Sequence, residues 1–347
     1  MRKQLTSVLM LLVVLSLLTS SCAAPTPTPA PTAVPKAAAP TAAPAKVYKL
    51  AAVLPGVITD ADYNTLGYIA ATAVQSDMGI KMAYSESVAV PDVERVMREY
   101  IDAGFNIIWT HGGQFISQTK GLAKQFPNVV FIGETDAPEA EAPENLWVID
   151  RNFQTGFYAL GVLAAKQTKS GKIGYLGGQT LGFSYAEVRA IQQAMKDTGS
   201  TATLKTVWAG DFNDPTKARQ IADAMIAEGV DVIIGSLNLG MFGLFEAVKA
   251  GSGAVLVTAK YTDKSSYAPK NCITSLLYDF AGPLKEIVTK IQAGQKGGYY
   301  PLGFATGVKL QLPLKNVGDD VNAAATKAID DVKSGKVQVV KDNTPIK

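Results

Sequence analysis

The chain has 347 residues, which allows about two domains at roughly 150 residues each. Hydrophobic residues make up 47% of it and charged residues 18%, so it can bury a large core and is not disordered as a whole. The 33 Lys and Arg nearly balance 30 Asp and Glu, which argues against a nucleic-acid-binding protein, and two Cys and one His exclude a disulfide framework and a zinc site built on Cys and His.

Residues 1–21 have the pattern of a signal peptide. A basic Met-Arg-Lys start precedes an uncharged apolar stretch over 5–18, and small polar residues then lead to Cys22. The stretch is short for a membrane span, although a single-pass anchor helix is the alternative. Cys22 resembles the acylation site of bacterial lipoproteins, except that Thr19 stands where those signals have Leu, Val or Ile. We therefore expect a lipid on Cys22 that anchors the protein to the cell membrane, outside the cytoplasm.

Residues 22–46 predict an extended tether. Beyond Cys22 the segment is almost entirely Ala, Pro and Thr, and its seven prolines forbid a helix and favour polyproline II. At roughly 3.1 Å per residue, such a segment reaches about 70 Å. It would hold a folded domain away from a membrane; a proline-rich ligand for another domain is the alternative.

From residue 47 onward, short apolar runs alternate with amphipathic stretches. The first half predicts strands over 49–54, 107–109 and 129–132, and helices over 64–77, 92–103 and 119–126. In the helix over 92–103, Val93, Val96 and Met97 share one face with Tyr100 and Ile101. Alternation of strands and helices predicts a parallel sheet with helices on both faces.

The pattern recurs in the second half, with strands predicted over 172–177, 230–234 and 272–277 and a helix over 215–228. Residues 103–108 align with 228–233, and the first strands of the two halves begin at Lys49 and Lys172, a nearly equal separation. Two units in register predict two lobes of like topology.

Two like α/β lobes around a cleft are the plan of periplasmic binding proteins. We therefore predict an α/β protein of the type I periplasmic-binding-protein fold, with two Rossmann-like lobes, a hinge and a ligand cleft between the lobes. The predicted first lobe comprises 47–150 and 262–294, and the predicted second lobe comprises 151–261 and 295–347.

Ligands of such sheets bind beyond the carboxyl ends of the strands, and the predicted strand ends share one chemical character. They combine glycines, aromatic rings and neutral or acidic hydrogen-bonding groups, with few Lys or Arg to hold a phosphate. This set suits a planar small molecule with several donors and acceptors, although any single ring could simply pack a loop. The candidate ligand-binding residues are Asp60, Tyr63, Asn64, His111, Gly113, Gln114, Phe183, Trp208, Phe212, Asn238, Tyr261 and Asp263.

Motifs for catalysis or cofactors are weak. Gly174, Gly177 and Gly178 follow a strand but lack the spacing of a dinucleotide fingerprint. His111 has no nucleophile-elbow serine to serve, and Cys272 lies in an apolar strand. We predict no catalytic residue, no cofactor and no metal site.

Several segments together resemble the basic membrane protein family of bacterial ABC-transporter solute-binding lipoproteins, a group that includes purine nucleoside receptors. The matching segments are 161–178, 212–217, 229–234 and 267–269 followed by 273–275. The resemblance extends from about residue 47 to the end of the chain. It implies an extracytoplasmic, monomeric binding protein that passes a small molecule to an ABC permease.

The resemblance also implies roles for single residues. The stretch Asp60-Ala-Asp62-Tyr63-Asn64 corresponds to the family's Asp-x-Ser-Phe-Asn, so Tyr63 would stack on a base and Asn64 would contact it. Phe183 or Phe212 would supply the second stacking ring. Tyr261 stands in place of the family's ribose-binding Asp, and Tyr278 stands in place of a Lys. The chain is also similar to a subgroup of the family that resembles proteins binding free purines. The expected cargo is a purine, as base or nucleoside.

Three alternatives remain open from the sequence. The same fold could present a ligand to a membrane receptor as a sensor. It could carry a sugar or a peptide, since stacking rings also suit sugars. It could also be a surface nucleoside hydrolase, although no run of neighbouring Asp at a strand end offers an acidic metal cluster.

Overall fold

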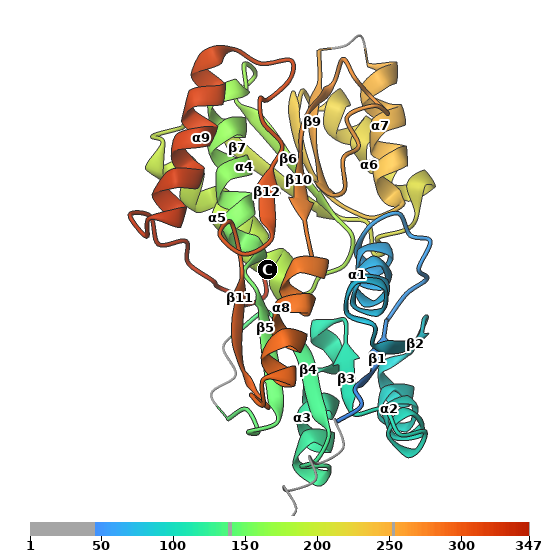
Figure 1. The fold of residues 1–347 in the computed structure, drawn as a ribbon. Coiled ribbons are helices and arrows are strands. Elements are labelled where there is room, and N and C mark those ends of the chain that lie inside the picture. Colours follow the sequence, from blue (N-terminus) through green and yellow to red (C-terminus); the bar gives the residue numbers. More distant parts are fainter. Residues whose placement is uncertain (1–45, 138–140, 252–253, 347) are drawn as a thin grey trace, which may run out of the picture. The chain divides into compact units, whose positions relative to one another are not determined.

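The computed structural model describes residues 46–137, 141–251 and 254–346, and the chain divides into two units, Met1–Lys46 and Val47–Lys347. The predicted signal peptide, Cys22 and nearly all of the predicted tether lie outside the described residues. The labelled helices and strands of Figure 1 belong to the second unit. Within the described part of the chain, no helix combines the length and apolar character needed to cross a bilayer.

The first sheet has the strand order β11-β5-β4-β3-β1-β2, and each neighbouring pair runs parallel. Its strands are β1 (Lys49–Val53), β2 (Lys81–Ser85), β3 (Ile107–Thr110), β4 (Val130–Thr135), β5 (Leu146–Arg151) and β11 (Gly298–Leu302). Its helices are α1 (Tyr63–Met78), α2 (Val93–Asp102), α3 (Ile116–Gln125) and α8 (Ala281–Gln292), with 3-10 turns η1 (Val90–Asp92) and η2 (Gly113–Phe115).

The alternation of buried side chains explains why helices cover both faces of this sheet. Leu50 and Ala52 of β1 pack into the core that α1 and α8 share, whereas Ala51 and Val53 pack into the core under α2 and α3. A strand buried on both faces needs a continuous apolar run, and residues 49–54 supply one. The apolar face predicted for 92–103 is the one that α2 turns inward.

The second sheet has the order β12-β10-β9-β8-β6-β7, and only β12 runs antiparallel to its neighbour among the pairs described. Its strands are β6 (Lys172–Gly177), β7 (Thr203–Trp208), β8 (Val232–Ser236), β9 (Leu256–Tyr261), β10 (Cys272–Tyr278) and β12 (Val308–Leu310). Its helices are α4 (Phe153–Gln167), α5 (Gly182–Asp197), α6 (Pro215–Ala227), α7 (Gly240–Ala250) and α9 (Asp319–Lys333). Helices α4, α5 and α9 pack together on one side of this sheet, and α6 packs against α7 on the other (Figure 1).

The two sheets repeat the same local arrangement, which confirms the predicted pair of like lobes. In the first lobe β1 lies between β2 and β3, and in the second lobe β6 lies between β7 and β8. The predicted first strands begin at Lys49 and Lys172, where β1 and β6 begin.

The C-terminal quarter of the chain crosses between the lobes differently from the prediction. The prediction assigned 262–294 to the first lobe, but β10 pairs with β9 in the second sheet and only α8 packs on the first. The prediction assigned 295–347 to the second lobe, but β11 pairs with β5 in the first sheet. The first lobe is therefore completed by α8 and β11, which follow β10 of the second lobe in the chain. The chain passes from one sheet to the other three times, after β5, β10 and β11.

Candidate functional site

A cavity of about 340 Å³ lies between the carboxyl ends of the parallel strands of the two sheets. This is where open α/β sheets bind ligands, and the volume falls in the range of small-molecule sites. Both lobes contribute to its walls. The predicted residues that line it are Tyr63, Asn64, Gln114, Phe183, Phe212, Asn238 and Tyr261.

The second lobe supplies a pair of stacked rings. Phe183, at the start of α5, and Phe212, after β7, have ring centroids 6.1 Å apart and an interplanar angle of 19°. The ring of Phe212 lies against Gly178, where a Cβ atom would come within 2.1 Å of the ring. A glycine is required there because no other residue leaves room for the ring.

The first lobe supplies Tyr63, whose ring is held from behind. His111, at the end of β3, is fully buried and stacks under Tyr63 with centroids 3.9 Å apart. The Tyr63 hydroxyl donates to Glu134 Oε2 at 2.5 Å, and His111 Nδ1 lies 2.6 Å from Glu134 Oε1. Tyr63 is thereby fixed to residues of two neighbouring strands, β3 and β4.

Both ring nitrogens of His111 have hydrogen-bond partners. Its Nε2 lies 2.8 Å from the Tyr63 carbonyl, which can only accept, and its Nδ1 faces the Glu134 carboxylate. Burial alone would raise the pKa of Glu134, but the charge and hydrogen bond of His111, with Arg151 and Tyr63, outweigh burial and lower it. An ionised Glu134 accepts, so it can hold both the Tyr63 hydroxyl and His111 Nδ1 in place.

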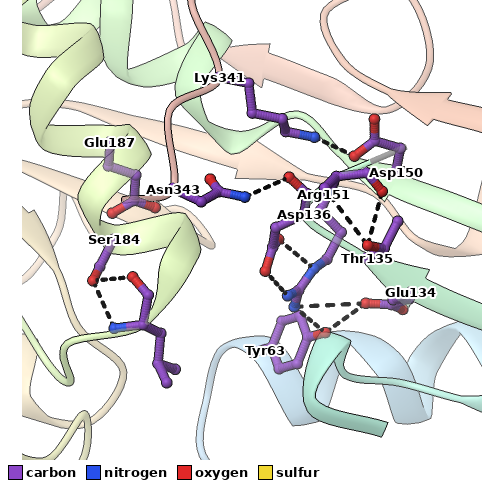
Figure 2. Close-up of polar contacts among 12 residues, drawn as sticks. Tyr63, Glu134, Thr135, Asp136, Asp150, Arg151, Ser184, Glu187, Lys341 and Asn343 are labelled. Atoms are coloured by element: carbon purple, nitrogen blue, oxygen red, sulfur yellow. Dashed lines mark hydrogen bonds and ion pairs between the residues drawn. The ribbon is translucent and has the colours of Figure 1, made fainter. Parts of the chain in front are cut away.

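Arg151, the last residue of β5, completes this wall (Figure 2). Its Nε and Nη2 donate to Asp136 at 3.1 and 2.8 Å, and its Nη1 donates to the Tyr63 hydroxyl at 2.7 Å. The guanidinium lies within 5.6 Å of the ring centroids of Tyr63 and Phe183, one from each lobe. Burial opposes its charge, yet Asp136, Tyr63 and Glu134 raise the pKa of Arg151 further, so the cavity contains a permanent cation.

Amide side chains from both lobes are oriented by Asp60. Its carboxylate accepts from the backbone N–H of Asn64 at 3.0 Å and from Nδ2 of Asn64 and Asn238 at 2.7 and 3.1 Å. Asp60 also accepts from the backbone N–H groups of Asp62 and Thr65, so it provides hydrogen-bond acceptors for N–H groups at the start of α1 that lack partners within the helix. Asp60 is 1% exposed and positions the two cavity amides rather than lining the cavity itself.

The lobes touch beside the cavity. The Thr262 hydroxyl donates to the Ala61 carbonyl at 3.2 Å, and Lys264 forms a buried ion pair with Asp62. Tyr261, directly before Thr262, has a φ of 75°, a left-handed conformation that costs roughly 1–2 kcal/mol for an L residue. Burial raises the pKa of Asp62 to about 7, against the opposing effect of Lys264.

A second buried ion pair lies behind the second-lobe wall. Lys260 Nζ donates to Glu187 Oε1 at 2.6 Å, and the Tyr175 hydroxyl donates to Glu187 Oε2 at 2.7 Å. Lys260 Nζ is 4.9 Å from the Phe183 ring centroid and 4.6 Å from that of Tyr261. Burial lowers the pKa of Lys260, while Glu187 opposes that shift.

Comparison with known proteins identifies the family. The model of a family described as ABC transporter substrate-binding protein PnrA-like matches residues 47–340. The chain belongs to this Bmp family. Its relatives include Basic membrane protein A2 of Borrelia garinii subsp. bavariensis, 30% identical over 67% of this chain and 68% of that protein. They also include a purine-binding protein of Brucella abortus, 24% identical over 74% of this chain and 72% of that protein.

Solved structures support the fold. An ABC-transporter solute-binding protein of Conexibacter woesei has a TM-score of 0.69 at 23% identity, covering 85% of this chain and 99% of that one. A solute-binding protein of Aeropyrum pernix has a TM-score of 0.73 at 17% identity, covering 86% and 94%. The predicted type I periplasmic-binding-protein fold is confirmed. Bmp proteins are extracytoplasmic solute-binding proteins of ABC transporters and do not form an enzyme family.

Five residues predicted to bind the Bmp ligand do not line the cavity. Asp60 and His111 are buried behind the residues they orient. Trp208 packs edge-on against Tyr185, with centroids 5.6 Å apart, and Asp263 is exposed and accepts from Gln311 Nε2 at 2.6 Å. Gly113 approaches Arg151 instead: a Cβ atom there would lie 2.6 Å from Arg151 Nη2.

Arg151 is the main cavity residue that the sequence reasoning missed. Its signal was present, because residues 146–149 are an apolar run after a turn and Arg151 follows at the carboxyl end. That run is β5, which is absent from the predicted strands, so the prediction does not include the residue at its end. Leu181 and Val90 also line the cavity, without a chemical pattern that could have marked them. Among the described residues, no three His, Cys, Asp or Glu are grouped to hold a metal ion.

Proposed function

We propose that this Bmp protein is the purine-binding component of an ABC importer. The observation that carries the proposal is a cavity between the lobes whose walls are Tyr63 on one side and the stacked Phe183 and Phe212 on the other. Rings on opposite lobes suit a flat aromatic ligand, and the amides of Asn64 and Asn238 can read its edge. The name of the Brucella abortus relative points to the same ligand class.

Ligand binding drives closure of the lobes in this proposal. A ligand that contacts both lobes only in the closed form stabilises that form. Asn238 donating to Asp60, and Lys264 pairing with Asp62, are contacts between the lobes that closure would assemble. The closed form then docks on the permease as a monomer, tethered by residues 22–46 and a lipid on Cys22.

Thermal shift of the full-length chain in mild detergent tests the ligand class. The panel contains adenine, hypoxanthine, guanine, their nucleosides, uridine, ribose and glucose. A purine at 100 times its Kd should stabilise the fold by about 2.7 kcal/mol. Stabilisation by sugars alone would show that the cargo is a sugar and not a purine. Release of free base from a nucleoside over many turnovers would show that the protein is a hydrolase.

The lipid anchor is tested by replacing Cys22 with Ser. The variant should be released from membranes, and a variant that stays on the membrane would contradict a lipid on Cys22.

A further inference from the structure

We propose that Arg151 selects among purines and that the preferred ligand carries an oxo group at C6 rather than an amino group. This inference rests on the proposed function and names the ligand class of the same cavity. Arg151 lines the cavity, although its side chain is only 5% exposed. It is therefore a buried cation placed where a bound base would meet it.

The hydrogen bonds of Arg151 leave donors free. A guanidinium has five N–H groups and no acceptor. Asp136 takes one from Nε and one from Nη2, and the Tyr63 hydroxyl takes one from Nη1. Among the described residues, no hydrogen bond uses the remaining N–H of Nη1 or of Nη2; the nearest further carboxylate oxygen, Glu134 Oε2, lies 3.8 Å from Nη1. Two neighbouring nitrogens can thus donate to a ligand.

The charges around Arg151 favour a neutral ligand. Asp136 and Glu134 carry two negative charges, which more than balance the positive charge of Arg151. The wall has no net positive charge with which to attract a phosphate or a carboxylate, and Asp211 adds a negative charge to the cavity lining. What the wall offers is a pair of strong donors for uncharged acceptor atoms.

A 6-oxopurine presents the matching acceptors. Its O6 and N7 lie side by side on one edge, the pair to which Arg donates with two hydrogen bonds in recognising guanine. A 6-aminopurine presents N7 beside an amino donor, so one arginine N–H would face another N–H. The free donors of Arg151 therefore distinguish the two kinds of base.

The guanidinium is fixed in position by contacts within the protein. Asp136 holds it through two hydrogen bonds, and the Asp136 carbonyl accepts in turn from Asn343 Nδ2 at 3.0 Å (Figure 2). Gly113 lies so close that a side chain there would displace Nη2. A donor held in this way discriminates well because it cannot turn away from an unsuitable ligand.

Isothermal titration of the full-length chain in mild detergent at pH 7 tests the inference. The ligands are hypoxanthine, adenine and unsubstituted purine, with inosine and adenosine as a second pair. We expect the 6-oxo member of each pair to bind about tenfold more tightly or better, with purine between the two bases. Equal affinities, or tighter binding of adenine and adenosine, would overturn the role of Arg151 and leave the purine function standing.

Variants assign the preference to Arg151. R151Q combined with D136N removes the guanidinium without leaving a lone buried carboxylate at Asp136, and R98Q removes an arginine that does not line the cavity. The double variant should bind both bases within about twofold of each other, and R98Q should keep the full preference. A preference that survives in a folded double variant would contradict the inference. If the double variant does not fold, the preference of the unmodified chain decides. If no base or nucleoside binds, the proposed function fails, and this inference with it.

Discussion

The two walls of the cavity present aromatic rings by different means. In the first lobe, Tyr63 is held by a chain of polar and charged groups, His111, Glu134 and Arg151, on three neighbouring strands. In the second lobe, Phe183 and Phe212 are held by each other and by close contact with Gly178. The first wall therefore depends on charge pairing and the second on shape, although the second also has the Lys260–Glu187 pair behind it.

This difference predicts unequal responses to substitution. Buried charges that lose a partner are strongly destabilising, because the remaining charge stays unpaired away from water. Loss of an aromatic packing contact at the cavity lowers the free energy of unfolding less, and its main effect is on the affinity for the ligand. Substitutions in the charged groups of either wall should thus lower stability, and substitutions that disturb the packed rings of the second wall should mainly lower affinity.

Glu134→Ala should have one of the two largest effects. It leaves His111, Arg151 and the Tyr63 hydroxyl without their shared carboxylate, so we expect a loss of about 3–5 kcal/mol in the free energy of unfolding. Urea denaturation measures it. Glu94→Ala, which breaks an exposed pair with Arg98, is the matched control and should cost below about 1 kcal/mol. Similar values for the two variants would show that the first wall does not depend on charge pairing.

Lys260→Met tests whether the second wall tolerates loss of charge. Alone, it leaves Glu187 buried and should cost about 3–5 kcal/mol. Combined with Glu187→Met, it removes both charges from a region already lined by Phe153 and Phe157, and most of the loss should be recovered. A double variant as unstable as the single one would show that this ion pair supports the wall in its own right.

The junction between the walls should respond to pH. Because the pKa of Asp62 is about 7 in the folded chain and 3.8 in its ordinary state, the folded chain binds more protons between those values. Stability should therefore fall as pH rises from about 4 to about 7, with Asp62 contributing on the order of 3 kcal/mol, and level off above that. Asp62→Asn removes the titrating group. Urea denaturation of both chains at several pH values in this range measures the free energy of unfolding. It should fall with pH more steeply in the unmodified chain than in Asp62→Asn, and equal slopes would contradict the raised pKa of Asp62.

Gly178→Ala should have the smallest effect on folding and a visible one on binding. The new Cβ would push the Phe212 ring out of its place in the cavity wall. Loss of one aromatic contact corresponds to about a 2- to 12-fold weaker affinity, measured by titration with hypoxanthine. Gly121→Ala, at an open position of α3, should leave that affinity unchanged. An unaltered affinity in Gly178→Ala would mean that Phe212 does not contact the ligand.

Much of the fold could be predicted because it follows from local periodicity. Continuous apolar runs such as 49–54 and 172–177 become buried parallel strands, and the face containing Val93, Val96 and Met97 becomes the buried face of α2. The exchange of β10 and β11 between the lobes could not be predicted in this way. β10 is a buried strand and β11 is a partly exposed edge strand, and periodicity does not specify the sheet that either joins.

The residues of the site were likewise predictable only in part from local sequence patterns. The sequence alone determined the two α/β units, the ends of strands where ligand contacts gather, and the resemblance to the Bmp family. The tertiary structure alone decided which of those contacts face the cavity and which stand behind it. His111 supports Tyr63 across 48 positions, and Arg151 reaches the same ring across 88. Such partners meet only when parallel strands align their carboxyl ends, so the charges that hold the first wall depend on strand order, which local sequence patterns do not encode.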